Sequence, residues 1–215
     1  VTGVDIKPQL RYCGDAFCQA DALEVPLEGY DLIWASPPCQ GYSALRHLPW
    51  LKDKSYPLLI DSIRERLRLS GTPWVIENVE RSPLRGFVLC GQSFGLPIYR
   101  HRKFETSFPC SAPVHRKHTV VVGHGRMLND RRKGTLNAGS SKGTWGTGGI
   151  ITVAGSQFKK SDGEKAMQID WMTKYELSQA IPPAYAEYIG KWWLQRYRRS
   201  ATVPDAPAKL EEAKR

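Results

Sequence analysis

Cys39 is the residue of this chain best placed for covalent chemistry. It follows an apolar run, residues 30–35, and stands directly behind Pro37 and Pro38. Proline fixes its own φ and holds the residue before it extended, so this turn aims the thiol. The thiolate form of cysteine is a nucleophile, although a cysteine after a strand is more often a small buried hydrophobe. The surrounding motifs decide between the two interpretations.

Three further charged side chains could act beside this thiol. Glu77 ends an apolar run, residues 74–79, that predicts the next strand. The carboxyl ends of strands in an open parallel sheet line one crevice, so we expect Cys39 and Glu77 to converge there. Arg100 and Arg102 share one face if their segment is extended. Two guanidiniums so placed suit a base carbonyl together with a phosphate or a carboxylate.

Four segments that contain these residues resemble the DNA cytosine-5 methyltransferases of phage or bacterial type. They occur in the order of that family and together cover most of residues 4–190. In the family's Arg-x-Arg segment, a glutamine usually stands two residues before the first arginine, whereas this chain has Ile98 there. The matching stretches are Pro38-Cys39-Gln40 with Ser43, residues 74–79, residues 94–97 with Arg100-His101-Arg102, and residues 179–185 with Ile189-Gly190.

The resemblance implies a covalent mechanism. The thiolate of Cys39 would add to C6 of a cytosine, after which C5 can attack the methyl group of S-adenosylmethionine. Glu77 would bond at N3 and stabilise the negative charge that develops in the ring. The target base must first leave the duplex stack. The other implied catalytic residues are Arg100 and Arg102, which would hold the base carbonyl, and Gln40 and Ser43, which would shape the loop over the flipped base.

The resemblance also implies a binding site for S-adenosylmethionine. Asp5 ends a short predicted strand, residues 1–6, and an acid at this position of nucleotide-binding sheets accepts hydrogen bonds from ribose hydroxyls. Ile6 would pack on the adenine, and Asp21 would accept a hydrogen bond from the adenine amino group, with Asp15 as a weaker candidate. The residues that complete the implied set are Ala22, Pro38, Gln179 and Ile181.

The positive charge of the chain is concentrated in one segment. The formal net charge is +10, and residues 100–160 carry 12 Lys and Arg against 2 Asp and Glu. Such a segment predicts a polyanionic partner, here double-stranded DNA, because neutralising phosphates releases counterions. A basic surface kept for solubility is the alternative. The residues that we expect to contact DNA are Arg126, Arg131, Arg132, Lys133 and Lys142.

The pattern of elements predicts an α/β fold. We expect a doubly wound, mostly parallel sheet of the type found in S-adenosylmethionine-dependent methyltransferases, with an amphipathic helix at residues 57–69 covering it. Further helices are predicted at residues 172–180 and 184–197. We expect a catalytic core at residues 1–106, a basic, loop-rich recognition insertion at 107–170, a return to the core at 171–199, and a flexible tail at 200–215.

Cysteine number and hydropathy narrow the setting. Five cysteines without paired spacing argue against a disulfide framework and for a reducing compartment. No stretch approaches the roughly 20 apolar residues of a membrane span, and no signal-peptide pattern is seen. We expect a cytoplasmic protein of a bacterial or phage-infected cell, with no membrane association and no obligate protein partner. Cys110, His115 and His118 lack a fourth ligand at zinc-site spacing, so we expect no metal.

Two other functions fit the same residues. The first is methylation of cytosine in RNA, as one branch of the family does with transfer RNA. The second is a DNA-binding remnant without catalysis. The joint presence of Cys39, Glu77, Arg100 and Arg102 argues against the remnant, whereas a missing cofactor loop argues for it.

That missing loop yields a prediction. The family begins with a strand and a glycine-rich turn, Phe-x-Gly-x-Gly, upstream of the acid that Asp5 matches, and this chain starts four residues before Asp5. We expect a piece of a longer protein that lacks about 20 to 30 residues, the length of one strand, turn and helix of such a unit. Calorimetry should find weak or no S-adenosylmethionine binding by this chain and clear binding by one extended upstream. Micromolar binding by the short chain would contradict this.

Overall fold

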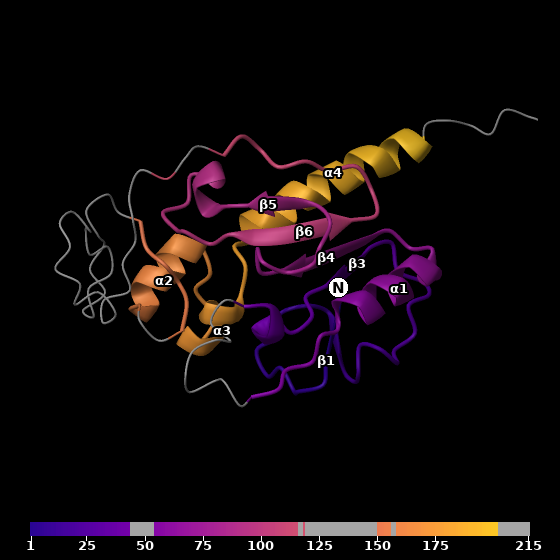
Figure 1. The fold of residues 1–215 in the computed structure, drawn as a ribbon, viewed down its shortest axis with the longest axis horizontal. Coiled ribbons are helices and arrows are strands. Elements are labelled where there is room, and N and C mark those ends of the chain that lie inside the picture. Colours follow the sequence, from indigo (N-terminus) through magenta and orange to yellow (C-terminus); the bar gives the residue numbers. More distant parts are fainter. Residues whose placement is uncertain (44–53, 116–117, 119–149, 156–157, 202–215) are drawn as a thin grey trace, which may run out of the picture.

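The computed structural model describes residues 1–43, 54–115, 118, 150–155 and 158–201 (Figure 1). All of the named strands lie in residues 1–106 together with α1, and α2, α3 and α4 follow from residue 160 onwards. In chain order they are β1 (Thr2–Asp5), β2 (Ala16–Gln19), β3 (Ile33–Ala35), the 3-10 helix η1 (Gln40–Tyr42), α1 (Ile60–Ser70), β4 (Trp74–Asn78), β5 (Phe87–Leu89), the 3-10 helix η4 (Gly91–Phe94), β6 (Arg102–Thr106), α2 (Lys160–Met167), α3 (Lys174–Gln179) and α4 (Pro183–Ala201).

The described strands form two sheets. β1 and β2 pair in parallel, with Asp5 opposite Gln19. The second sheet has the order β3-β4-β6-β5, in which β3 and β4 are parallel and β6 runs antiparallel to both of its neighbours. The α/β class is therefore confirmed, whereas a single, mostly parallel doubly wound sheet is not. Between β5 and β6 the chain forms only η4 and no α-helical crossover, which is the connection that parallel neighbours usually need.

α1 covers one face of the second sheet, as the amphipathic pattern predicts. Its buried Ile63 and Leu67 pack with Trp74 and Ile76 of β4. The helix ends at Gly71, whose φ of 69° lies in the left-handed region that glycine adopts without strain. Leu58 is the exception to the predicted apolar face, because it precedes the helix and is exposed.

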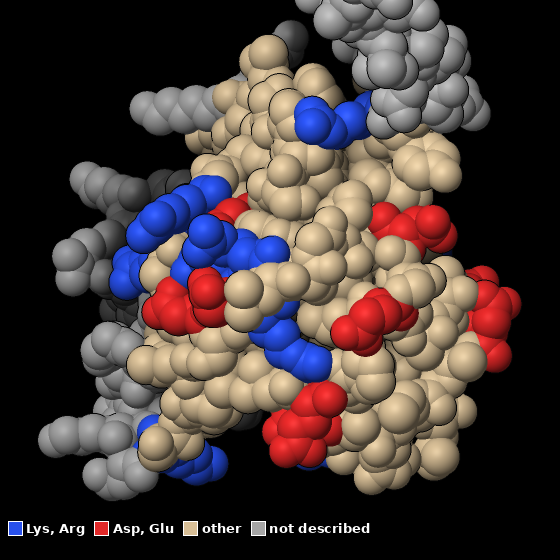
Figure 2. Space-filling model, turned by 90° about the vertical axis from the view of Figure 1, so that its right-hand side faces the viewer, with Lys and Arg blue, Asp and Glu red and all other residues tan. Residues whose placement is uncertain are grey.

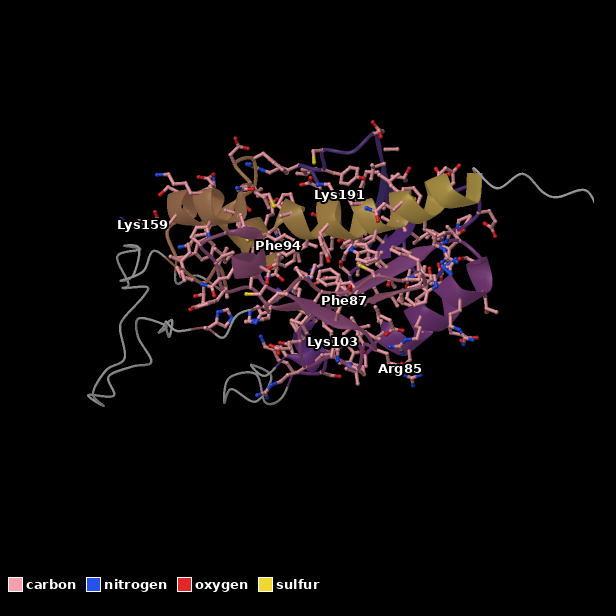
Figure 3. The ribbon with its side chains drawn as sticks, turned by 90° about the horizontal axis from the view of Figure 1, so that it is seen from above. Arg85, Phe87, Phe94, Lys103, Lys159 and Lys191 are labelled. Carbon is pink, nitrogen blue, oxygen red and sulfur yellow. The ribbon has the colours of Figure 1, made fainter. Side chains whose placement is uncertain are left out.

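α4 covers the opposite face (Figure 3). Successive strand residues point to opposite faces, so Val75 of β4 turns away from α1 and packs with Tyr185 and Ile189 of α4. Phe104 of β6 completes this core, its ring 6.1 Å from that of Tyr185. Phe94, labelled in Figure 3, lies 5.2 Å from the same tyrosine ring. The helix predicted at residues 184–197 is confirmed, and its aromatics form core contacts.

α2 and α3 form a third core with the segment before β6. Ile98 and Ile151 form an isolated β-bridge, and both are buried with Met167 and Leu177. α3, predicted at residues 172–180, begins with a capping box in which Thr173 accepts from the amide of Glu176. Residues 151–169, expected within the recognition insertion, thus pack against Ile98 where the structure describes them. Residues 119–149 lie outside the described residues.

The described surface carries mixed charge. On the face drawn in Figure 2, Lys and Arg side chains lie beside Asp and Glu side chains. Among the described residues on this face, basic and acidic side chains are therefore neighbours. Among the residues that the structure describes, none of the helices is both long enough and apolar enough to span a bilayer.

The hydroxyl of Tyr185 provides a test of how α4 is held. It donates to the backbone carbonyl of Arg100 at 2.6 Å, and the side chain is fully buried. Tyr185→Phe should lower the free energy of unfolding by about 1–3 kcal/mol, because the carbonyl loses its partner in a buried site. Chemical denaturation measures this. Tyr175→Phe, at an exposed tyrosine, is the control and should change stability by less than about 0.5 kcal/mol. Equal effects would contradict the assignment.

Candidate active site

The loop that carries Cys39 is fixed at both of its ends. β3 delivers the chain to residues 36–38, and Cys39 then caps η1 with φ −91° and ψ −10°. Gly41 is buried so closely that an added Cβ would lie 2.6 Å from Leu58 Cδ2. The hydroxyl of Tyr42 accepts a hydrogen bond from the Ile60 amide at 3.2 Å. The half-buried thiol is therefore presented by a loop that is clamped to the start of α1.

Asn78 ties this loop to the neighbouring strand. Its Nδ2 donates to the carbonyl of Pro37 at 2.8 Å, and its Oδ1 accepts from the Val79 amide at 2.9 Å. The side chain is almost fully buried. The sequence motif contained Asn78 but gave it no role. Its position next to Glu77 at the end of a buried strand was the available signal, because a buried amide must find partners.

Glu77 and Arg102 form a buried ion pair. Glu77 Oε1 lies 2.9 Å from Arg102 Nε, and both side chains are largely shielded from solvent. The Ser36 side chain also hydrogen-bonds to the carboxylate. Burial raises the pKa of Glu77 above its ordinary value of 4.5, and outweighs the lowering by Arg102, Ser36 and Arg100. The carboxyl group can therefore hold a proton nearer to neutral pH than a solvated glutamate can.

Arg100 has different contacts from Arg102. One terminal nitrogen donates to the carbonyl of Val153 and the other donates to the carbonyl of Ser178, the second at 2.8 Å. Its Nε is buried without a hydrogen-bond partner among the described residues. Burial, together with Arg102, lowers the pKa of Arg100 to about 9. The guanidinium thus ties the start of β6 to the segments around α2 and α3.

The electrostatics of Arg100 also show which predicted residues the fold brings together. Glu77, Arg102 and Cys39 all lie near enough to act on the charge of this guanidinium. The four residues proposed from sequence for the chemistry therefore gather at one end of β3, β4 and β6. Gln40 is exposed in η1, and its carbonyl accepts from the Ser43 amide at 3.3 Å.

The residues expected to bind S-adenosylmethionine lie in several parts of the fold. The carboxylate of Asp5 accepts from the Lys7 amide at 2.8 Å and from Gln9 Nε2 at 3.0 Å, so it forms a local turn at the end of β1. Asp21 likewise accepts from the Leu23 amide at 2.8 Å. The other members are Ile6 (64% exposed), Ala22 and Pro38 (exposed), Gln179 (exposed, at the end of α3) and Ile181 (partly buried against the α4 core).

The described residues of β1 are compatible with part of such a site. A carboxylate has about four acceptor positions, and the two bonds to Asp5 leave capacity for ribose hydroxyls. Ile6 is exposed beside it and can cover a ring.

The five residues expected to contact DNA, Arg126, Arg131, Arg132, Lys133 and Lys142, lie outside the described residues.

Similarity to known proteins assigns no family to this chain. The chain matched no protein-family model, no curated protein and no solved structure.

The raised pKa of Glu77 predicts how stability depends on pH. The folded protein takes up a proton on this carboxyl at higher pH than the unfolded chain does, so the resulting stabilisation is full below pH 4.5 and is lost as pH rises through the folded pKa. Relative to Glu77→Gln, the free energy of unfolding of the wild type should therefore fall as pH rises from 4.5 towards neutrality. Denaturant titrations across this range measure the difference.

Glu65→Gln is the control for loss of one carboxylate, because Glu65 pairs with Arg68 at an exposed site. A gain in the stability of the wild type relative to Glu77→Gln as pH rises would show that Arg102, not burial, dominates the pKa of Glu77.

Proposed function

We propose that this protein is a DNA cytosine-5 methyltransferase that acts through a covalent bond between Cys39 and C6 of the target base. The observation that carries the proposal is the buried Glu77–Arg102 pair beside the Cys39 loop, in which burial raises the pKa of the carboxyl group. A nucleophile next to a group that can share a proton with a heterocycle is the arrangement that this addition needs. Such an enzyme would act in the cytoplasm of a bacterial or phage-infected cell.

The first step is addition to an aromatic ring that resists nucleophiles. The Cys39 sulfur forms a bond to C6, and the electron pair of the C5–C6 double bond moves into the ring. The carboxyl group of Glu77 hydrogen-bonds to N3 and stabilises the charge that develops there. Glu77 suits this role because its raised pKa brings it closer to the protonated state at neutral pH.

The second step makes the new carbon–carbon bond. The adduct has a nucleophilic C5, to which S-adenosylmethionine would supply its methyl group, with cleavage of the sulfur–methyl bond and release of S-adenosylhomocysteine. Asp5 and Ile6 would hold the ribose and adenine at the end of β1. Transfer of the C5 proton to a water molecule then restores the double bond and expels the Cys39 thiolate, so the protein is regenerated.

Arg102 serves as the orienting residue of this site. Its Nε holds one carboxylate oxygen of Glu77, so the carboxyl group has a fixed direction. The remaining donors of this guanidinium can bind the base carbonyl. Arg100 has a supporting role, because its two terminal nitrogens bind the carbonyls of Val153 and Ser178.

DNA is the proposed polymer because of the basic segment at residues 100–160. RNA carries the same phosphate charge, so the polymers are distinguished by activity. Labelled S-adenosylmethionine should transfer its methyl group to duplex DNA and not to transfer RNA. The assay uses the 215-residue chain or the chain extended at its N-terminus, whichever binds S-adenosylmethionine.

Cys39→Ser tests the covalent step. A DNA duplex with 5-fluorocytosine at the target position should trap the wild type as a stable covalent complex, since fluorine at C5 blocks the final elimination. Cys39→Ser should lose methyl transfer and trapping while DNA affinity changes no more than a few-fold, because the thiol contributes little to phosphate contacts. Cys18→Ser, at an exposed cysteine outside the loop, should trap like the wild type. Trapping by the Cys39→Ser protein would overturn the assignment.

A further inference from the structure

A cysteine and three histidines gather where β5 ends and β6 begins, at the edge of the second sheet opposite β3. Cys90 follows β5 directly and caps η4, whereas His101 immediately precedes β6. His115 and His118 come from the chain beyond β6. The Sγ atom and one ring nitrogen from each histidine all lie within 4.8 Å of one another.

The spacing of these four atoms matches a tetrahedral metal site. His118 Nε2 lies 3.1 Å from His101 Nε2, 3.1 Å from His115 Nε2 and 3.7 Å from Cys90 Sγ. Zinc–nitrogen bonds of about 2.0–2.1 Å and a zinc–sulfur bond of about 2.3 Å at tetrahedral angles place two nitrogens about 3.3 Å apart, and a nitrogen and the sulfur about 3.6 Å apart. The three separations from His118 are close to these values, and the remaining pairs of donor atoms lie within 4.8 Å of one another.

Hydrogen bonding among the four side chains does not account for the arrangement. His118 Nδ1 contacts the side-chain oxygen Oε1 of Gln92, which is only an acceptor, so the proton of the neutral ring is on Nδ1. Nε2 of His118 then has a single lone pair, yet two imidazoles and a thiol converge on it. A cation at the centre of the group satisfies all four atoms at once.

The surroundings fit the needs of metal ligands. Gln92 fixes the tautomer and direction of His118 in the way that outer-shell partners usually do. The ring of Tyr99 packs edge-on against the same histidine, with the centroids 4.2 Å apart.

We propose that Cys90, His101, His115 and His118 bind one zinc ion in a closed structural site. Nitrogen and sulfur donors in this combination favour zinc, and four protein ligands leave no position open for a reacting water. This proposal departs from our expectation from the sequence that no metal is bound. Of the three residues weighed from sequence spacing, His115 and His118 belong to this group and Cys110 does not. Cys90 and His101 were not among them.

The role of the ion follows from where its ligands lie. His101 stands between Arg100 and Arg102, so a bond from its Nε2 to zinc would fix the segment that carries both arginines. His115 and His118 would anchor the chain to β5 directly before residues 119–149, which carry five Lys and Arg against one Asp. The inference does not depend on the proposed methyltransferase activity, because metal binding is measured directly.

Metal content and cobalt substitution test this site. The purified chain should retain one equivalent of zinc after gel filtration, measured by mass spectrometry of the metal. The cobalt(II) form should show intense tetrahedral d–d bands and a thiolate-to-cobalt charge-transfer band. Cys90→Ser should lose the charge-transfer band, and Cys110→Ser, the matched control, should keep it. Gln92→Ala should weaken zinc binding about 10- to 100-fold, as loss of an outer-shell partner does.

His115→Ala keeps the test decisive if Cys90→Ser does not fold, because His115 is the exposed ligand and its loss disturbs no core packing. This variant should fold, and should bind zinc more weakly than the wild type. A wild-type chain that takes up no zinc, or a charge-transfer band that is lost in Cys110→Ser and kept in Cys90→Ser, would overturn the proposal.

Discussion

The buried ion pair between Glu77 and Arg102 is the interaction on which the candidate site depends. Two charges taken out of water are tolerated only when each compensates the other, and removing one partner of such a pair costs about 3–5 kcal/mol because the remaining charge is left unpaired. Here the partners belong to β4 and β6, which are adjacent antiparallel strands. The position of the carboxyl group is therefore coupled to correct strand pairing, and a site with the wrong pairing would also be unstable.

Arg100 extends this coupling to the second half of the chain. Its guanidinium binds the carbonyls of Val153 and Ser178, and its own carbonyl accepts from Tyr185 of α4. Three segments that follow β6 in sequence are thus held by one residue. Since that residue precedes β6 directly, the helices and the ion pair are positioned together. A charged side chain is an effective connector here because it can donate to several backbone carbonyls at once.

Local patterns in the sequence predicted several helices and strands and the turn at Cys39, but they did not predict how the strands pair. Apolar periodicity located α1 and α4, and the apolar run at residues 74–79 located β4, because burial acts on each segment separately. The antiparallel direction of β6 depends on how the chain returns to the sheet, which no local pattern encodes. Arg100 and Arg102 are residues of the same type that lie two positions apart, so their different contacts become visible only in three dimensions.

The histidine cluster illustrates the same limit for ligands. Its members come from the end of β5, the start of β6 and the segment beyond it, so no short spacing in the sequence joins them. Cys110 is close to His115 and His118 in sequence, whereas Cys90 and His101 approach these histidines only in the folded chain. Asn78 differs, because its position at the end of a buried strand was visible in the sequence, whereas its partner, the Pro37 carbonyl, is seen only in the fold.

The division into two sheets has a consequence for how the molecule meets other chains. Within the described residues, β1 pairs with β2 alone and β3 pairs with β4 alone, so each has one edge whose backbone amides and carbonyls face no strand. Such an edge is a template for any extended segment, whether from the same molecule or from another. β1 has four residues and β3 has three, and short edge strands of this kind are one of the ways in which proteins limit uncontrolled edge-to-edge association.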